Sequence, residues 1–175
     1  MGKRRDEKAY NLVRRGNRKR LRHLLGKHEE LRTSNDAILV SAAIWHNRGM
    51  LYWLLERGVL PDCCGESDGG NTPLMHAASE GDIPVMKLLL GFGADPNALN
   101  EESENALGFS VSWKQLEAIK LLVAAGADVN NTDDSGPDRT QLDSAKLSEW
   151  TERVAVLRTL GGKRYADLIS EAETA

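Results

Sequence analysis

The stretch that decides the fold reads Gly70-Asn71-Thr72-Pro73-Leu74-Met75-His76-Ala77-Ala78, then Gly81-Asp82, then Lys87-Leu88-Leu89-Leu90-Gly91-Phe92-Gly93-Ala94-Asp95-Pro96-Asn97. Thr72 predicts a helix N-cap, because its side-chain oxygen can accept a backbone N–H of the first turn. Pro73 suits the first helical position, where its missing N–H costs nothing. Gly81 ends this helix, and a second apolar run ends near Gly93, which suits the left-handed residue past a helix end. The stretch therefore predicts two helices joined by a short turn.

The same pattern recurs along the chain. Gly93-Ala94-Asp95-Pro96-Asn97 returns 33 residues later as Gly126-Ala127-Asp128-Val129-Asn130, and Leu74 returns as Leu107. A fixed period of this size is typical of stacked helix-turn-helix units, and a 33-residue period with a Thr-Pro-Leu start is the ankyrin pattern. The sequence resembles the ankyrin-repeat family, most strongly over residues 67–130.

The resemblance predicts one domain over residues 1–175, an all-α solenoid of about five stacked helix-turn-helix units with finger loops between them. The terminal units are expected to be degenerate caps. We number the units one to five, with approximate ranges 6–32, 33–66, 67–99, 100–132 and 133–162. Residues 163–175 are expected to form a tail or a short helix.

Composition indicates a cytoplasmic protein. Hydrophobic residues make up 41% of the chain, the mean hydropathy is -0.44, and no run approaches the ~20 apolar residues of a membrane span. Met1–Glu7 leads into no apolar stretch, so no signal peptide is expected. Cys63 and Cys64 are adjacent and form no disulfide framework.

No motif indicates catalysis, a cofactor or a metal. The four histidines are scattered, Cys63-Cys64 lacks a Cys-x-x-Cys partner, and no Gly-rich phosphate loop precedes a helix. His76 is placed with no nucleophile or carboxylate. We therefore expect a non-catalytic protein without cofactor or metal.

The family resemblance implies a binding surface. Ankyrin proteins bind other proteins in a concave groove made of finger loops and the inner faces of the first helices. Carried onto this sequence, the candidate partner-binding residues are Ile44, Trp45, Asp68, Asn71, Ser79, Glu80, Glu101, Glu102, Glu104, Ser112 and Trp113.

Two tryptophans stand out among these residues. Trp45 and Trp113 occupy the position of Glu80 in their own units, at the end of the first helix. Exposed tryptophan is enriched among binding hot spots, so both are predicted to be anchors about 20 Å apart, two stacking distances along the solenoid. The alternative is that each ring folds down over its own repeat.

The inter-unit loops are acidic, which predicts a partner with a basic surface. Charge complementarity of this kind raises association rates, although ordinary solubility also explains acidic loops. The predicted function is capture of a partner protein, as an adaptor or inhibitor, with an immunity-type protein as one version. The protein is expected to be monomeric when unbound.

Unit one is basic and leaves an alternative open. Residues 1–32 hold twelve Lys and Arg against four Asp and Glu, a balance of +8, whereas the remaining residues balance at −11 and the chain at -3. A terminal unit needs a polar outer face, which explains the charge as a solvated cap. The alternative is contact with nucleic acid or an acidic surface through residues 3–22. No interleaved aromatic residues support base stacking there.

Overall fold

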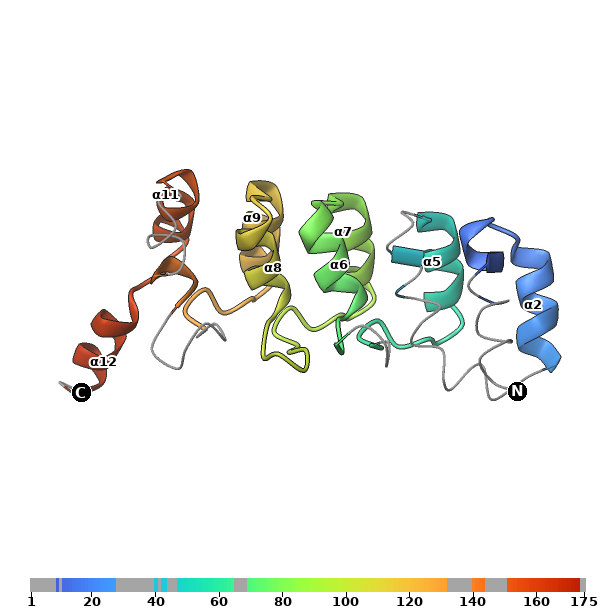
Figure 1. Cartoon of the computed structure of the whole chain (residues 1–175), viewed down its shortest axis with the longest axis horizontal. Helices are drawn as coiled ribbons and strands as arrows, with labels where there is room; N and C mark the ends of the chain where they lie inside the picture. Colours follow the sequence, from blue (N-terminus) through green and yellow to red (C-terminus); the bar gives the residue numbers. More distant parts are fainter. Residues whose placement is uncertain are drawn as a thin grey trace.

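The computed structural model describes residues 9, 11–27, 40, 42–43, 47–64, 69–131, 140–143 and 151–173. Helices follow one another in a single row, and the connecting loops run along one edge of the row (Figure 1). The named helices are α2 (Arg18–Lys27), α5 (Arg48–Leu55), α6 (Pro73–Glu80), α7 (Ile83–Gly91), α8 (Ala106–Ser112), α9 (Leu116–Ala124), α11 (Thr151–Thr159) and α12 (Tyr165–Glu173).

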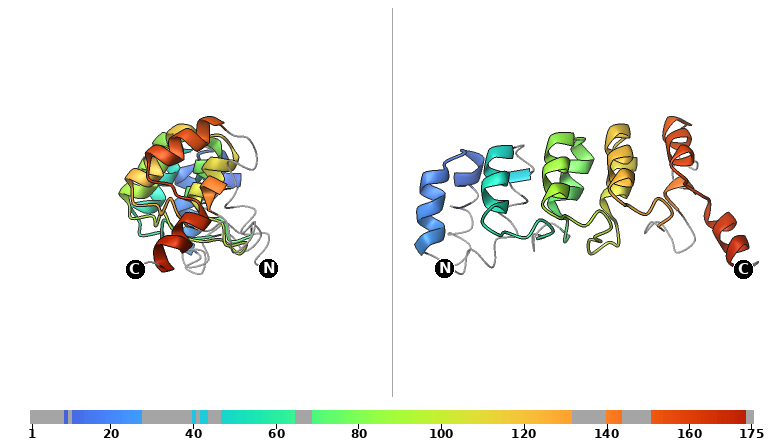
Figure 2. Two further views of the ribbon diagram at one scale, coloured as in Figure 1. Left: turned by 90° about the vertical axis from the view of Figure 1, so that its left-hand side faces the viewer. Right: turned by 180° about the vertical axis from the view of Figure 1, so that it is seen from behind.

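The helices form two layers that run along the row. In the first layer α6 packs against α8, while in the second layer α7 packs against both α5 and α9, and α9 also packs against α11. Within a unit, α6 pairs with α7 and α8 pairs with α9. Apart from one bridge residue, Thr140, the described residues form helices, turns and loops. The predicted all-α solenoid is confirmed, and Figure 2 shows it end-on and from behind.

The deciding stretch folds as its residues predict. The Thr72 side chain accepts the Met75 N–H at 3.3 Å, and the Thr72 N–H is in turn donated to Met75 Sδ. Met75 therefore completes a reciprocal capping box with a sulfur acceptor. Pro73 occupies the first turn, and Gly81 ends α6 with φ of 67°. The Asn105 side chain caps α8 in the same way, accepting the Gly108 N–H at 2.9 Å.

A thin apolar core runs the length of the row. Its fully buried members recur at equivalent positions of successive units, as with Leu54 and Leu89, or Leu74 and Leu107. Trp53 stands where unit three has Leu88 and is 7% exposed, so its ring packs in the core. Because one cluster of buried side chains runs through successive units, a Leu→Ala change in it removes contacts between units as well as within them, at a typical cost of about 2–5 kcal/mol.

One set of inter-unit hydrogen bonds lies in the loops. In each case an Asp or Asn side chain, four residues past the glycine that ends a second helix, accepts a backbone N–H of the following unit. The pairs are Asp62 with Asp95 at 3.0 Å, Asn97 with Asp128 at 2.8 Å, and Asn130 with Lys163 at 2.7 Å. We call these three bonds the loop ladder.

A second set satisfies the last turns of the first-layer helices. The final carbonyls of a helix have no partner inside it, so they need donors from elsewhere. Here the donor is a side chain at the start of the second helix in the next unit. The bonds are Asn47 Nδ2 to the Val13 carbonyl at 3.2 Å, Gln115 Nε2 to that of Ser79 at 2.9 Å, and Arg153 Nη1 to that of Val111 at 2.6 Å.

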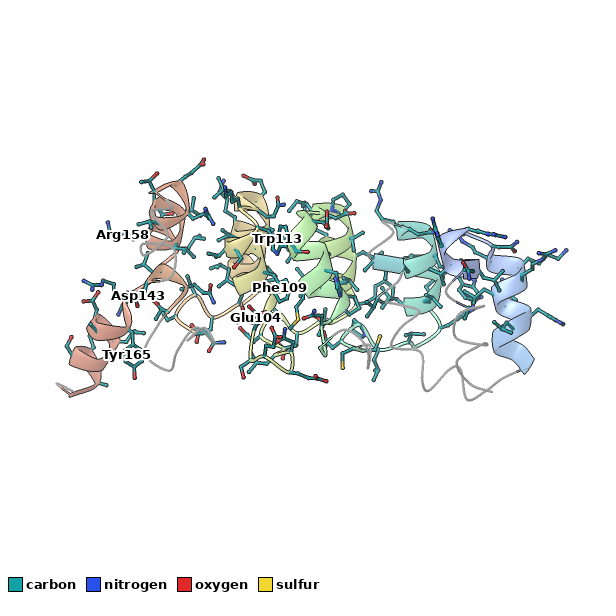
Figure 3. The ribbon with its side chains drawn as sticks, viewed as in Figure 1. Glu104, Phe109, Trp113, Asp143, Arg158 and Tyr165 are labelled. Carbon is teal, nitrogen blue, oxygen red and sulfur yellow. The ribbon has the colours of Figure 1, made fainter. Side chains whose placement is uncertain are left out.

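Asp143 joins the C-terminal helix to the row. Its carboxylate accepts the N–H of Tyr165, the first residue of α12, at 2.7 Å, and the Thr140 hydroxyl at 3.1 Å. Arg164 Nε lies 3.4 Å from the same carboxylate. A negative charge at a helix N-terminus is stabilising, so Asp143 fixes where α12 starts. In Figure 3, Asp143 and Tyr165 lie at the junction of α12 with the preceding segment.

The turn between α8 and α9 contains strain that the equivalent turn in unit three lacks. Lys114 has φ of 65°, whereas Gly81 takes the equivalent position with φ of 67°. A left-handed conformation costs a non-glycine residue about 1–2 kcal/mol. We expect Lys114→Gly to raise the free energy of unfolding by about 0.5–1 kcal/mol, because part of the relieved strain is offset by the flexibility of glycine in the unfolded chain. Urea titration followed by circular dichroism measures the change.

The matched variant at Gly81 should move stability in the opposite direction. A Cβ at Gly81 would lie 2.8 Å from Gln115 Cδ, in the side chain that bonds the Ser79 carbonyl. Gly81→Ala therefore adds both strain and a clash. If Lys114→Gly lowered the free energy of unfolding as much as Gly81→Ala does, the positive φ of Lys114 would not be strained.

Asp143 should make the docking of α12 dependent on pH. Burial alone would raise the pKa of its carboxyl, but hydrogen bonds from Tyr165, Thr140 and Arg164 outweigh burial and hold the pKa below its usual 3.8. A depressed pKa stabilises the fold fully above the unfolded value, and this stabilisation is lost as pH falls through the folded pKa. The Tyr165 amide resonance should therefore titrate with a midpoint below 3.8. In Asp143→Asn the chemical shift of the Tyr165 amide should not change over this pH range. A midpoint above 3.8 in the wild type would show that hydrogen bonds do not hold the pKa of Asp143 down.

Candidate functional site

Trp113 lies at the C-terminal end of α8 with most of its ring in solvent. It is the C-cap residue of the helix, its N–H bonds to the Phe109 carbonyl at 3.0 Å, and 64% of its surface is exposed. Phe109 is half-buried and lies one helical turn earlier, so the two rings share a face of the helix. Glu104, Phe109 and Trp113 follow one another from the finger loop to the end of α8 (Figure 3).

The neighbouring positions on the first-layer helices differ in how free they are. Ser112 and Glu80 are exposed at the ends of α8 and α6. Ser79 is half-buried; its hydroxyl donates to the His76 carbonyl at 2.8 Å and its own carbonyl accepts from Gln115. Ser79 thus serves the stacking of unit four on unit three, whereas Glu80, Ser112 and Trp113 present their surfaces to solvent.

Asn100 organises the finger loop before α8. Its side-chain oxygen accepts the N–H groups of Glu102 at 3.0 Å and Glu104 at 2.8 Å, while its amide nitrogen donates to Asn71 Oδ1 at 2.8 Å. The Asn100 N–H bonds to the Glu104 carbonyl at 2.9 Å and closes the loop. Asn71, a predicted site residue, therefore links two successive fingers.

The acidic side chains of this finger lie beside the Trp113 helix. Glu101 and Glu102 are exposed, and Glu104 is half-buried. The Glu101 N–H bonds to the Gly69 carbonyl at 2.9 Å, which ties the tip of the finger to the preceding loop. We call Glu80, Glu101, Glu102, Phe109, Ser112 and Trp113 the Trp113 surface.

Three predicted site residues, Ile44, Trp45 and Asp68, lie outside the described residues. The alternative for Trp113, that its ring folds down over its own repeat, does not fit its 64% exposure. Sequence reasoning missed Phe109 and Asn100. The four-residue spacing of Phe109 and Trp113 was available as a signal for the first, whereas the role of Asn100 as the centre of a loop has no local signature.

Among the described residues, no group of three or more His, Cys, Asp or Glu side chains is placed to hold a metal ion. In the same part of the chain, no helix is long and apolar enough to cross a membrane.

Comparison with known proteins agrees with this geometry. A family profile described as "Ankyrin repeats (3 copies)" matches residues 39–133, more than half of the chain. The chain belongs to the ankyrin-repeat family. Ankyrin repeats are in general protein–protein interaction modules, typically without catalytic activity.

Several ankyrin relatives share part of the sequence. Ankyrin repeat protein nuc-2 of Neurospora crassa is 48% identical over 56 residues, which is 32% of this chain and 5% of that protein. Zygote-specific protein 3 of Chlamydomonas reinhardtii is 36% identical over 90 residues, or 51% of this chain and 24% of that protein. Ankyrin repeat and SOCS box protein 16 of Homo sapiens is 39% identical over 62 residues, covering 35% of this chain and 14% of that protein. The chain therefore spans less than a quarter of each relative.

The finger loop gives a direct test of how the acidic residues are held. Asn100→Ala removes two acceptor bonds and the donor bond to Asn71, so we expect a loss of about 1–2 kcal/mol in the free energy of unfolding. The Glu102 and Glu104 amides should exchange with solvent faster, as measured by hydrogen exchange. Asn100→Asp keeps the accepting oxygen but places a carboxylate oxygen beside Asn71 Oδ1 and Glu104 Oε2, so these amides should exchange more slowly than in Asn100→Ala and faster than in wild type. Unchanged exchange in Asn100→Ala would show that the loop holds its shape without this side chain.

Proposed function

We propose that this ankyrin protein captures a partner protein with a basic surface on the Trp113 surface, with Trp113 as the central anchor. The observation that carries the proposal is the exposure of Trp113 on a helix whose other large apolar residues are buried or half-buried. Tryptophan is rarely left this exposed without a use, and it is the residue type most enriched in binding hot spots.

The position of the acidic residues supports a basic partner. Glu80 lies at the end of α6, and Glu101 and Glu102 lie on the finger before α8. An aromatic centre with a charged rim is the usual anatomy of an interface, because the anchor loses its water while the rim charges stay solvated. Held by Asn100, the finger presents its charges in a fixed place, which reduces the ordering cost of binding.

A protein that captures its partner in this way can cover the partner's surface or link the partner to a second protein, and neither action needs a catalysed reaction. Covering a basic protein surface is the chemistry of an inhibitor, and an immunity-type protein that masks the cationic face of a nuclease is one example. Bridging that surface to a second protein makes an adaptor. The two roles differ in whether the activity of the partner falls when it is bound.

The test begins with the partner recovered by co-purification from the native host. Trp113→Ala should weaken its binding by about 2 kcal/mol or more, which is about thirtyfold in Kd. Isothermal calorimetry with the purified partner measures this loss. Leu60→Ala removes an apolar side chain that is 72% exposed in another loop, and it should leave the Kd unchanged. Equal affinities for wild type and Trp113→Ala would remove the proposal.

The charge of the partner is tested with the same purified partner by two charge reversals of equal size, with association rates measured by stopped-flow fluorescence. Glu102→Lys lies on the acidic finger, and Glu117→Lys lies on α9 in the other layer, where its side chain is 73% exposed. Only the first should slow association severalfold at low salt, because charges beside an interface act mainly on the association rate. Faster association of Glu102→Lys would indicate an acidic partner.

A further inference from the structure

A cleft lies on the second-layer side of the N-terminal half, away from the Trp113 surface. It has a volume of about 500 Å³ and lies between α2, α5 and α7. Its apolar lining comes from Tyr52, Trp53, Pro84 and Leu88, and its charged lining includes Arg18 and Arg48. The proposed capture of a basic partner uses none of these residues.

The two arginines are available to a ligand. Arg18 and Arg48 are both exposed, and neither side chain makes an ion pair or hydrogen bond with another described residue. Arg18 reaches from α2 across to the first turn of α5, where a Cβ on Gly49 would lie 3.3 Å from its Cζ. The absence of a side chain at Gly49 thus gives Arg18 room at the start of α5, and arginines from two successive units line the same cleft.

Further cations reinforce the positive charge around the cleft. The Arg57 guanidinium lies 3.9 Å from the centre of the Trp53 ring, and that of Arg22 lies 5.9 Å from it. Arg57 is held there by a 3.0 Å bond from Nη1 to the Trp53 carbonyl. Glu56 also lines the cleft, but it faces the Tyr52 hydroxyl, whose pKa its hydrogen bond and charge raise. The segment Arg18–Lys27 carries no acidic residue.

Exposed aromatic surface adjoins these charges. Tyr52 is 46% exposed and Phe92 is 38% exposed, and their rings meet edge-to-face at 5.8 Å. A small anion or a phosphate backbone would use the arginines and leave this apolar surface open to water. Arginine, tyrosine and tryptophan together are the composition of a protein-binding hot spot.

We propose that the cleft binds an acidic protein segment that carries an apolar anchor side chain. The anchor packs on Tyr52, Pro84 and Leu88, and flanking carboxylates pair with Arg18 and Arg48. The arginines of the cleft favour a negatively charged ligand. The apolar lining favours a ligand that also has an apolar side chain, which a polypeptide can provide. This site prefers acidic ligands, whereas the Trp113 surface is proposed to prefer a basic one, so the two are independent.

The probe is a labelled peptide, Glu-Glu-Leu-Glu-Glu, followed by fluorescence anisotropy with the full chain at low salt. Binding should weaken about five- to tenfold in Arg48→Ala and in Arg18→Ala, because each loses a charge-assisted contact. Arg15→Ala removes an exposed arginine that does not line the cleft and should have little effect. Trp113→Ala should bind the peptide as wild type does, which separates this site from the proposed function.

The apolar part is tested with Glu-Glu-Gly-Glu-Glu, which lacks the anchor. Tyr52→Ala should weaken binding of the leucine peptide and leave the weaker binding of the glycine peptide unchanged. The Trp53 indole N–H, buried without a hydrogen-bond partner among the described residues, should give an NMR resonance that moves with the leucine peptide. Trp53→Phe assigns that resonance. Melting temperatures of all variants confirm that they are folded.

Three outcomes would overturn the proposal. Equal losses in Arg15→Ala and Arg48→Ala would indicate diffuse charge attraction without a site. Equal Kd values for the leucine and glycine peptides would show that no apolar side chain is bound in the cleft. Tighter binding of a single-stranded oligonucleotide or of inorganic phosphate, with the same sensitivity to Arg18 and Arg48, would assign the cleft to phosphate chemistry.

Discussion

The structure depends on backbone groups of one unit being satisfied by side chains of its neighbour. The loop ladder does this for the N–H groups of Asp95, Asp128 and Lys163, and a second set of donors does it for carbonyls at the ends of the first-layer helices. Each bond contributes only about 0.5–1.5 kcal/mol net, but an unpaired partner left at the interface would cost more. The apolar core stabilises the contact between units but is not directional. The hydrogen bonds have a defined length and angle, so they fix the spacing between stacked units.

This fixed spacing explains why the candidate site can be built from separate units. Glu80 belongs to unit three, and the finger and Trp113 belong to unit four, yet Gln115 locks the end of α6 to the start of α9. Gly81 leaves room for that glutamine, and Asn100 locks the fingers to one another through Asn71. The Trp113 surface is thus preorganised by contacts that none of its own exposed side chains provides.

Sequence reasoning reached the fold because its signals are local and repeated. Thr72, Pro73, Gly81 and Asn105 each act within one helical turn, and the 33-residue period propagates the result. The exposure of Trp113 was also predictable, since its equivalence to Glu80 placed it at the end of a first-layer helix. The acceptors within those turns differ from unit to unit: the N–H of Thr72 is donated to the sulfur of Met75, and the hydroxyl of Thr140 is donated to the carboxylate of Asp143.

The sequence could not predict contacts between residues 22 or 42 positions apart whose partners share no motif. Nothing in the sequence around Arg153 indicated that its side chain would be buried against the Val111 carbonyl. Nor did the sequence around Asp143 indicate that its carboxylate would accept the first N–H of α12. The cleft between α2, α5 and α7 depends on Arg18 lying over Gly49, which is a matter of side-chain direction. Such features arise where units differ from one another, so the repeat pattern that predicts the fold carries no information about them.

The loop ladder also has a consequence for how a chain of this kind can change over time. Every rung joins a unit only to the next one, so the same rung can be repeated any number of times without a global closure to satisfy. Duplicating the 33 residues between Asn97 and Asn130 would insert one more rung and leave every other bond in place. Because the duplicated residues include Trp113, the extra unit would carry a second such tryptophan one stacking distance further along the row. The number of units can therefore change during evolution while the cleft between α2, α5 and α7 stays as it is.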